Sequence, residues 1–133
     1  MNLLTITRIF LGIIFIWYGT LKFFSGVSPA EGLAIATIDK LFFSLIPPTV
    51  SIILLAIWEL IIGIGFLVGR YLKYVSILYL VHITLTFTPL ILLPELCFTN
   101  PPFEFTIVGQ YIGKNLIFFM VGLMIYQQNK SKT

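Results

Sequence analysis

The chain has 133 residues, of which 59% are hydrophobic and only 10% are charged. Its mean hydropathy is +1.06, whereas about a quarter of the residues of a soluble domain are charged. This composition excludes an ordinary soluble enzyme and indicates an integral membrane protein, with the lipid bilayer as its main partner. The net charge of +3 gives no reason to expect a nucleic-acid partner.

Four apolar segments have the length of a membrane-spanning helix, namely residues 3–24, 49–68, 74–93 and 107–126. Each is close to the roughly 20 residues that cross the hydrocarbon core as a helix. They are apolar on all faces and too long for the strands of a membrane barrel, and the connections between them are polar or rich in proline. The sequence therefore predicts a single all-α membrane domain, a four-helix bundle that runs up, down, up and down.

The cations near the ends of the apolar segments predict the orientation of the bundle. They lie near the amino end, in the second connection and in the tail, at Arg8, Arg70, Lys73, Lys130 and Lys132. The third connection carries Glu95 and Glu104 but no cation. Because cytoplasmic loops carry an excess of Lys and Arg, both termini are predicted to lie in the cytoplasm. We expect a multi-pass protein whose first segment is retained rather than cleaved.

The first connection contains a helix start. Positions 28–31 read Ser-Pro-Ala-Glu, which matches a capping box with proline at the first helical position. The pattern predicts a short helix over residues 29–40 at the outer surface, with Glu31 as a cap rather than a catalytic acid.

The single cysteine and the paired glycines allow two further inferences. Cys97 has no partner in the chain, which excludes an internal disulfide and the dithiol of a membrane thiol oxidoreductase. It is expected to be a small apolar residue of an outer loop. Glycines four residues apart, at positions 65 and 69 and at 109 and 113, are expected to allow close helix contact.

Four residues of the Lys, Arg, His, Asp and Glu types lie at the middle or in the outer half of the predicted spans, namely Lys22, Glu59, His82 and Lys114. At 1.5 Å per residue, Glu59 and His82 fall near the middle of their helices, and Lys114 lies roughly 10 Å below the outer end of the fourth. A charge at the centre of the bilayer costs at least about 2.5 to 3.5 kcal/mol, so these side chains are expected to face inward and to find partners. Glu59 is expected to pair with Lys114 or with Lys22.

Other polar residues continue these positions at helical spacing. Thr86 follows His82 by four residues, Gln110 precedes Lys114 by four, and Tyr18 precedes Lys22 by four. If these stripes converge, they enclose a polar pocket open toward the outer leaflet. Candidate catalytic residues are Glu59, His82 and Lys114, and candidate ligand-binding residues are Tyr18, Lys22, Trp58, Thr86, Gln110 and Asn115.

Each of these residues also has a structural interpretation. Lys22 is close enough to a helix end to extend its ammonium group to the interface. Glu59 and Lys114 can form a buried pair that only fixes the helix register. A lone histidine such as His82 more often bonds a carbonyl or bridges two helices than binds a metal, so no metal site is predicted.

The order of these features resembles the DoxX-like family of small four-helix bacterial membrane proteins. The similarity rests on "RIFLGIIFIWYGTLKFF", "SPAEGL", "WELIIGIGFLVGR", "HITLTFTPLILLPE" and "GQYIGKNLIFFMVGL". It implies a location in the bacterial inner (plasma) membrane and a membrane subunit of a quinone-linked redox or oxidative-stress system. Carried over to this chain, Glu59, His82 and Lys114 are the positions that could serve a quinone head group.

Three hypotheses on function follow. In the first, the chain is a subunit of a quinone-dependent oxidoreductase, with no cofactor of its own and with electrons from a redox partner subunit. In the second, it is a non-catalytic membrane anchor or assembly subunit, alone or as a homo-oligomer, whose buried charges fix helix packing. In the third, the polar stripe is a proton or small-solute pathway, which four helices without an inverted repeat support weakly.

Overall fold

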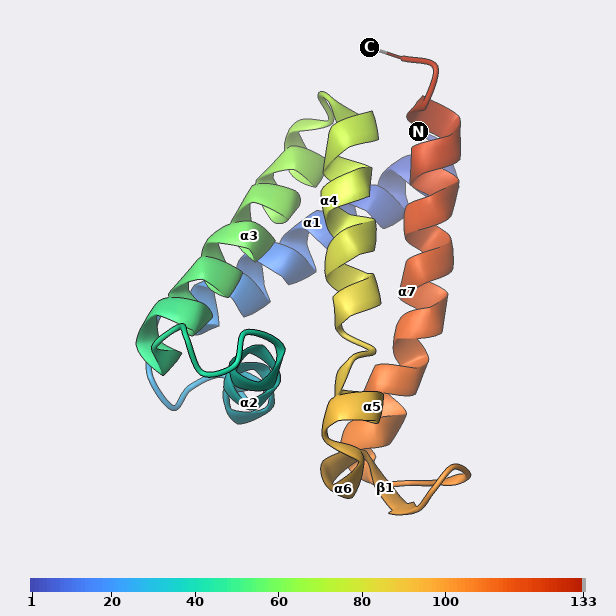
Figure 1. The fold of residues 1–133 in the computed structure, drawn as a ribbon. Helices are drawn as coiled ribbons and strands as arrows, with labels where there is room; N and C mark the ends of the chain where they lie inside the picture. The colour runs from blue at the N-terminus through green and yellow to red at the C-terminus, as the bar shows by residue number, and fades with distance from the viewer. Residues whose placement is uncertain (133) are drawn as a thin grey trace.

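The structure is a computed structural model and describes residues 1–132. Four of its helical segments are long and apolar enough to cross a membrane, which confirms the predicted all-α membrane bundle (Figure 1). They are α1 (Leu3–Leu21), α3 (Pro48–Val68), α4 (Leu72–Leu85) continued by α5 (Pro89–Leu92), and α7 (Ile107–Asn129). Shorter elements lie between them: α2 (Glu31–Leu41), α6 (Pro94–Cys97), β1 (Phe98–Asn100) and β2 (Glu104–Phe105).

The long helices are arranged as two pairs. Helix α1 packs mainly against α3, and α4 packs mainly against α7, while α3 and α4 join the pairs. The two chain ends and the turn between α3 and α4 lie at one end of the bundle, and α2, α5, α6 and β1 lie at the other (Figure 1). The first helix ends at Leu21, three residues earlier than predicted, and the last extends to Asn129, three residues further.

Small residues bring α1 and α3 close together. A Cβ atom added to Gly63 would lie 2.9 Å from the carbonyl oxygen of Gly12, and one added to Gly19 would lie 3.2 Å from that of Ala56. Each helix therefore places two small residues seven positions apart against the other. Such contacts allow the helix backbones to approach closely. In a bilayer this close packing drives helix association, because an apolar side chain is as well solvated by lipid as by another helix.

The glycine pairs chosen from the sequence behave differently from the prediction. Gly113 has no neighbour within 4 Å of a Cβ position, and Gly109 lies against the backbone of Cys97, the last residue of the short helix α6, rather than against another span. The expectation of close helix contact therefore fails for Gly113, while Gly109 makes its close contact with α6. Gly65 does touch α4 at Val75, whereas Gly69 ends α3 in the left-handed conformation, with φ of 76°.

The third span is interrupted rather than continuous. Helix α4 ends at Leu85 and α5 begins at Pro89, because a proline has no amide hydrogen to donate to the carbonyl four residues back. The Thr88 hydroxyl instead donates to the Leu85 carbonyl oxygen at 2.7 Å. Asn115 of α7 contacts the break by donating to the Thr86 hydroxyl at 2.8 Å. The Thr88 hydroxyl thus satisfies a backbone carbonyl group that lipid could not.

The first connection contains the predicted short helix, but its start differs. Helix α2 begins at Glu31 after Ala30, and no side chain caps it. The Glu31 carboxylate accepts from the amide of Gly26 at 2.7 Å, so it holds the loop before the helix. The predicted capping box with Ser28 is therefore wrong, because the loop turns back and offers Glu31 a different amide.

The core lies where the two helix pairs meet, in the half of the bundle that contains the termini. Tyr79 is fully buried against Phe15 and Phe66, with ring centroids 5.3 Å from each. Its hydroxyl donates to the Phe118 carbonyl oxygen of α7 at 2.9 Å, and its ring packs on Gly122. This contact joins all four spans and supports the polar group beside it.

Candidate functional site

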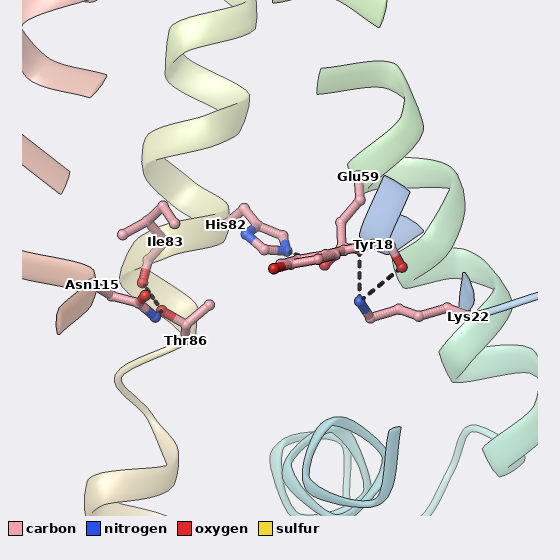
Figure 2. Close-up of polar contacts among 7 residues, drawn as sticks. All are labelled: Tyr18, Lys22, Glu59, His82, Ile83, Thr86 and Asn115. Atoms are coloured by element: carbon pink, nitrogen blue, oxygen red, sulfur yellow. Dashed lines mark hydrogen bonds and ion pairs between the residues drawn. The ribbon is translucent and has the colours of Figure 1, made fainter. Parts of the chain in front are cut away.

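Three of the predicted ionisable residues meet at the centre of the bundle. The Lys22 ammonium group lies 2.8 Å from Oε2 of Glu59, and the His82 Nε2 atom lies 3.1 Å from Oε1 of the same carboxylate. Figure 2 shows Lys22 and His82 on either side of Glu59. All three residues are at most 8% exposed. The carboxylate thus bridges two nitrogen donors in a site shielded from lipid and water, which we call the Glu59 cluster.

Local structure places each member of the cluster. Lys22 is the residue after the last turn of α1, and its ammonium group also donates to the Tyr18 carbonyl oxygen at 3.4 Å. Glu59 is near the middle of α3. Gly19 lets α1 approach this point, since a Cβ atom there would lie 3.1 Å from the Glu59 Cβ. The interpretation that Lys22 extends to the membrane interface is therefore wrong, because a carboxylate lies within its reach in the bundle.

Aromatic rings enclose the imidazole of His82. The ring of Phe15 lies 5.3 Å from it and that of Trp58 lies 5.5 Å from it, both roughly edge to face. Trp58 precedes Glu59 in α3 and, although it points elsewhere around the helix, its ring still reaches His82. These rings keep the imidazole in one orientation, with Nε2 toward Glu59.

Two buried polar atoms beside the cluster have no hydrogen-bond partner within the described residues. They are Nε1 of Trp58 and Nδ1 of His82. When Glu59 is ionised, Nε2 of His82 carries the hydrogen that the carboxylate accepts, so Nδ1 is an acceptor in the neutral ring and a donor in the protonated ring. Buried polar atoms nearly always have a hydrogen-bond partner. A polar atom of a bound ligand can therefore be the partner of each of these two.

Lys114 does not belong to this cluster. Its side chain is exposed on the surface of α7, and its ammonium nitrogen lies 5.4 Å from the ring centroid of Tyr111. The alternative in which Glu59 pairs with Lys114 is therefore wrong. Helix α7 packs on α4 rather than on α3, and the adjacent Asn115 takes the position that faces α4. Lys114 gains a cation–π contact instead of a carboxylate.

The remaining candidates divide between the interior and the surface. Thr86 and Asn115 form a separate contact at the break after α4, on the far side of His82 from Lys22 (Figure 2). Gln110 and the ring of Tyr18 are exposed, so they do not line the cluster. The predicted stripe of Gln110 and Lys114 on α7 therefore faces outward rather than into the bundle, and the adjacent Asn115 points inward instead.

Two residues of the site were not identified from the sequence. Phe15 packs on the imidazole, and Gly19 gives the space that lets Lys22 reach Glu59. One signal could have revealed this helix pair. Small residues lie seven positions apart on both spans, at Gly12 and Gly19 on the first and at Ala56 and Gly63 on the second. Residues 1–132 contain no group of three His, Cys, Asp or Glu side chains placed to hold a metal.

Comparison with protein families supports the order of features along the chain. A family model described as DoxX matches residues 3–91, which is more than half of the sequence. The chain belongs to the DoxX family. The matched segment contains Lys22, Glu59 and His82, so the whole Glu59 cluster lies within the part that the DoxX model describes. Lys114 lies beyond it. Comparisons with curated proteins and with solved structures found no match.

Proposed function

We propose that this DoxX-family protein is the membrane subunit of a quinone-linked redox or oxidative-stress system in the bacterial inner membrane. The observation that supports this function is the Glu59 cluster together with the two unpartnered atoms beside it, Nε1 of Trp58 and Nδ1 of His82. A charged cluster within a membrane span is costly and is most often kept for function.

The residues present fit a quinone head group at this position. A carbonyl oxygen accepts hydrogen bonds, and Trp58 Nε1 can only donate one. A bound quinone would supply the chemistry of a two-electron, two-proton acceptor. We place the electron donor in a partner protein.

In this proposal the side chains of the Glu59 cluster transfer protons to or from the bound quinone. His82 contacts Glu59 through Nε2 and presents Nδ1 on the other side of the ring. An imidazole can take up a proton at one nitrogen and release one from the other. Lys22 balances the charge of the carboxylate while the proton moves. Trp58 orients the ligand by donating to it.

One observation favours the alternative of a non-catalytic anchor or assembly subunit. Both oxygens of the Glu59 carboxylate have partners from the other helices, Lys22 on one side and His82 on the other. A cluster satisfied in this way can fix the register of three helices without any ligand. The third hypothesis, a proton or solute pathway, has no comparable observation in its favour.

The two tryptophans of the chain allow a direct test. Trp17 is 63% exposed on α1, so Trp17→Phe leaves Trp58 as the only indole reporter beside His82. The purified variant is titrated with a short-chain quinone in detergent, and Trp58 fluorescence is recorded. We expect saturable quenching that the further substitution His82→Phe weakens about tenfold, the loss of one or two polar contacts. Lys114→Gln, on the surface of α7, is the matched control and should leave the titration unchanged.

The outcomes separate the hypotheses. Quenching that rises linearly without saturation, and equally in all variants, would reflect quinone dissolved in the micelle and would contradict the proposal. If His82→Phe instead lowers the thermal stability while the titration stays linear, the structural alternative is supported. Under the pathway hypothesis, purified protein in vesicles should conduct protons without a partner.

A further inference from the structure

A second polar feature lies at the end of the bundle that contains both termini, far from the Glu59 cluster. A cavity of about 280 Å³ is enclosed by the start of α1, the turn after α3 and the end of α7. Its polar walls are formed by Asn2, Thr5, Arg8, Gln128, Asn129 and Lys132. Two of these are cations, and none is an acid.

The acidic side chains of the chain all lie away from this cavity. The five acidic residues are Glu31, Asp39, Glu59, Glu95 and Glu104. Four of them lie in α2 or in the connection between α5 and α7, at the opposite end, and Glu59 lies at the centre. No carboxylate of the described chain is therefore near enough to neutralise Arg8 or Lys132, and the electrostatic potential of the cavity favours an anion.

Arg8 is held in place by backbone groups rather than by a counter-ion. Its Nη1 donates to the Phe66 carbonyl oxygen in the last turn of α3, where the helix dipole favours a cation. The guanidinium packs against the turn at Gly69, where an added Cβ atom would lie 2.9 Å from it. An arginine has five N–H donors in a rigid plane, and among residues 1–132 only one of those of Arg8 has a partner. A fixed guanidinium with free donors is well suited to a phosphate.

The amide side chains add neutral donors to the same cavity. Asn2 accepts from the Thr5 amide through Oδ1, so its Nδ2 group is left to donate. Gln128 is exposed toward the cavity opening. A cavity with this lining at a membrane surface resembles the basic pockets between spans that hold lipid head groups.

We propose that this cavity binds a phosphate anion, with the phosphodiester of an anionic phospholipid as the occupant at the membrane surface. Arg8 provides a preoriented guanidinium, Lys132 provides a mobile second cation, and Asn2 and Gln128 complete the shell. The site is independent of the Glu59 cluster and of the function proposed for it.

The tail of the chain offers a matched pair of variants. Lys132 lines the cavity, whereas Lys130, two residues earlier, is exposed and does not. Lys132→Glu and Lys130→Glu change the net charge equally, and both lie beyond the spans. Native mass spectrometry of the full chain in detergent measures the retention of phosphatidylglycerol or phosphatidylcholine, and inorganic phosphate is added in a third series. We expect phosphatidylglycerol to bind in preference to phosphatidylcholine, and Lys132→Glu to weaken its binding about tenfold.

Lys130→Glu should change the phosphatidylglycerol affinity by less than about twofold, because its charge acts only through solvent. If inorganic phosphate binds the cavity as tightly as phosphatidylglycerol and displaces it at equal concentration, the cavity is an anion site whose occupant is free phosphate rather than the lipid. Equal weakening by both tail variants would show attraction to the net charge alone and would overturn the proposal. Arg8→Gln should abolish the preference for phosphatidylglycerol over phosphatidylcholine. If Tyr79 stays protected from solvent in that variant, the bundle is still folded and the effect is the loss of the site.

Discussion

The buried pair of Lys22 and Glu59 gives a quantitative prediction for the substitution Glu59→Gln. At 2.8 Å and an effective dielectric constant of about 20, the attraction between the two charges is about 6 kcal/mol. Burial of both ions offsets much of that attraction. The amide of Gln keeps an acceptor for His82 but leaves the Lys22 ammonium group, in a residue only 6% exposed, without a counter-charge. We therefore expect a loss of about 3 to 5 kcal/mol in the free energy of unfolding.

A second variant isolates the charge from the packing. Lys22→Met combined with Glu59→Gln removes both charges and keeps the volume of both side chains. The double variant should recover to within about 1 kcal/mol of the native protein, because replacing a whole buried pair by neutral groups is often close to neutral. Lys114→Met is the matched control for loss of a lysine in a span, and it should have little effect since Lys114 is on the surface of α7.

The assay is unfolding of the purified protein in mixed micelles as the fraction of denaturing detergent rises, followed by circular dichroism and by tryptophan fluorescence. Two results would refute this reasoning. One is a loss below about 1 kcal/mol for Glu59→Gln, which would mean that Lys22 readily finds water at the helix end. The other is a double variant no more stable than the single one, which would mean that packing rather than charge holds the site.

Two further predictions concern the helix contact and the cysteine. Gly63→Ala places a Cβ atom 2.9 Å from the Gly12 carbonyl oxygen and should cost about 1 to 3 kcal/mol in the same unfolding assay. Gly113→Ala, with open space around it, should be neutral or stabilising, and equal effects would contradict the packing described. Burial, with the nearby Glu95 carboxylate, raises the pKa of the Cys97 thiol, so less thiolate is present at a given pH. Its alkylation by iodoacetamide, followed by mass spectrometry, should keep rising above the usual thiol pKa, and a plateau below that pKa would refute this.

The sequence was sufficient to predict the fold class, because apolar length defined four spans. Counting along the helices placed Glu59 near the middle of α3, as found. His82, also expected near the middle of its helix, lies in the last turn of α4 because the helix breaks before Pro89. The sequence could not decide between two lysines as the partner of Glu59, because that choice depends on which helices touch. Helix α1 lies against α3 through Gly12 and Gly63, and this contact brings Lys22, not Lys114, to the carboxylate.

The interruption of the third span could have been expected from one residue. Pro89 lies within the predicted third span, residues 74–93, and its missing amide hydrogen already argued for a break. The contact between the break and α7 could not be predicted, because it depends on Asn115, which comes from a helix distant in the sequence. Contacts between distant segments, rather than local preferences, account for most of the differences from the sequence-based expectations.

The pairing of α1 with α3 has a consequence for the biogenesis of the protein. Lys22 and Glu59 belong to the first two spans to be synthesised, and His82 belongs to the third. A nascent chain that has inserted α1 and α3 therefore already contains both members of the ion pair. Each charge can enter the bilayer together with its opposite, which lowers the cost of insertion. His82 then joins a pair that no longer carries a net charge.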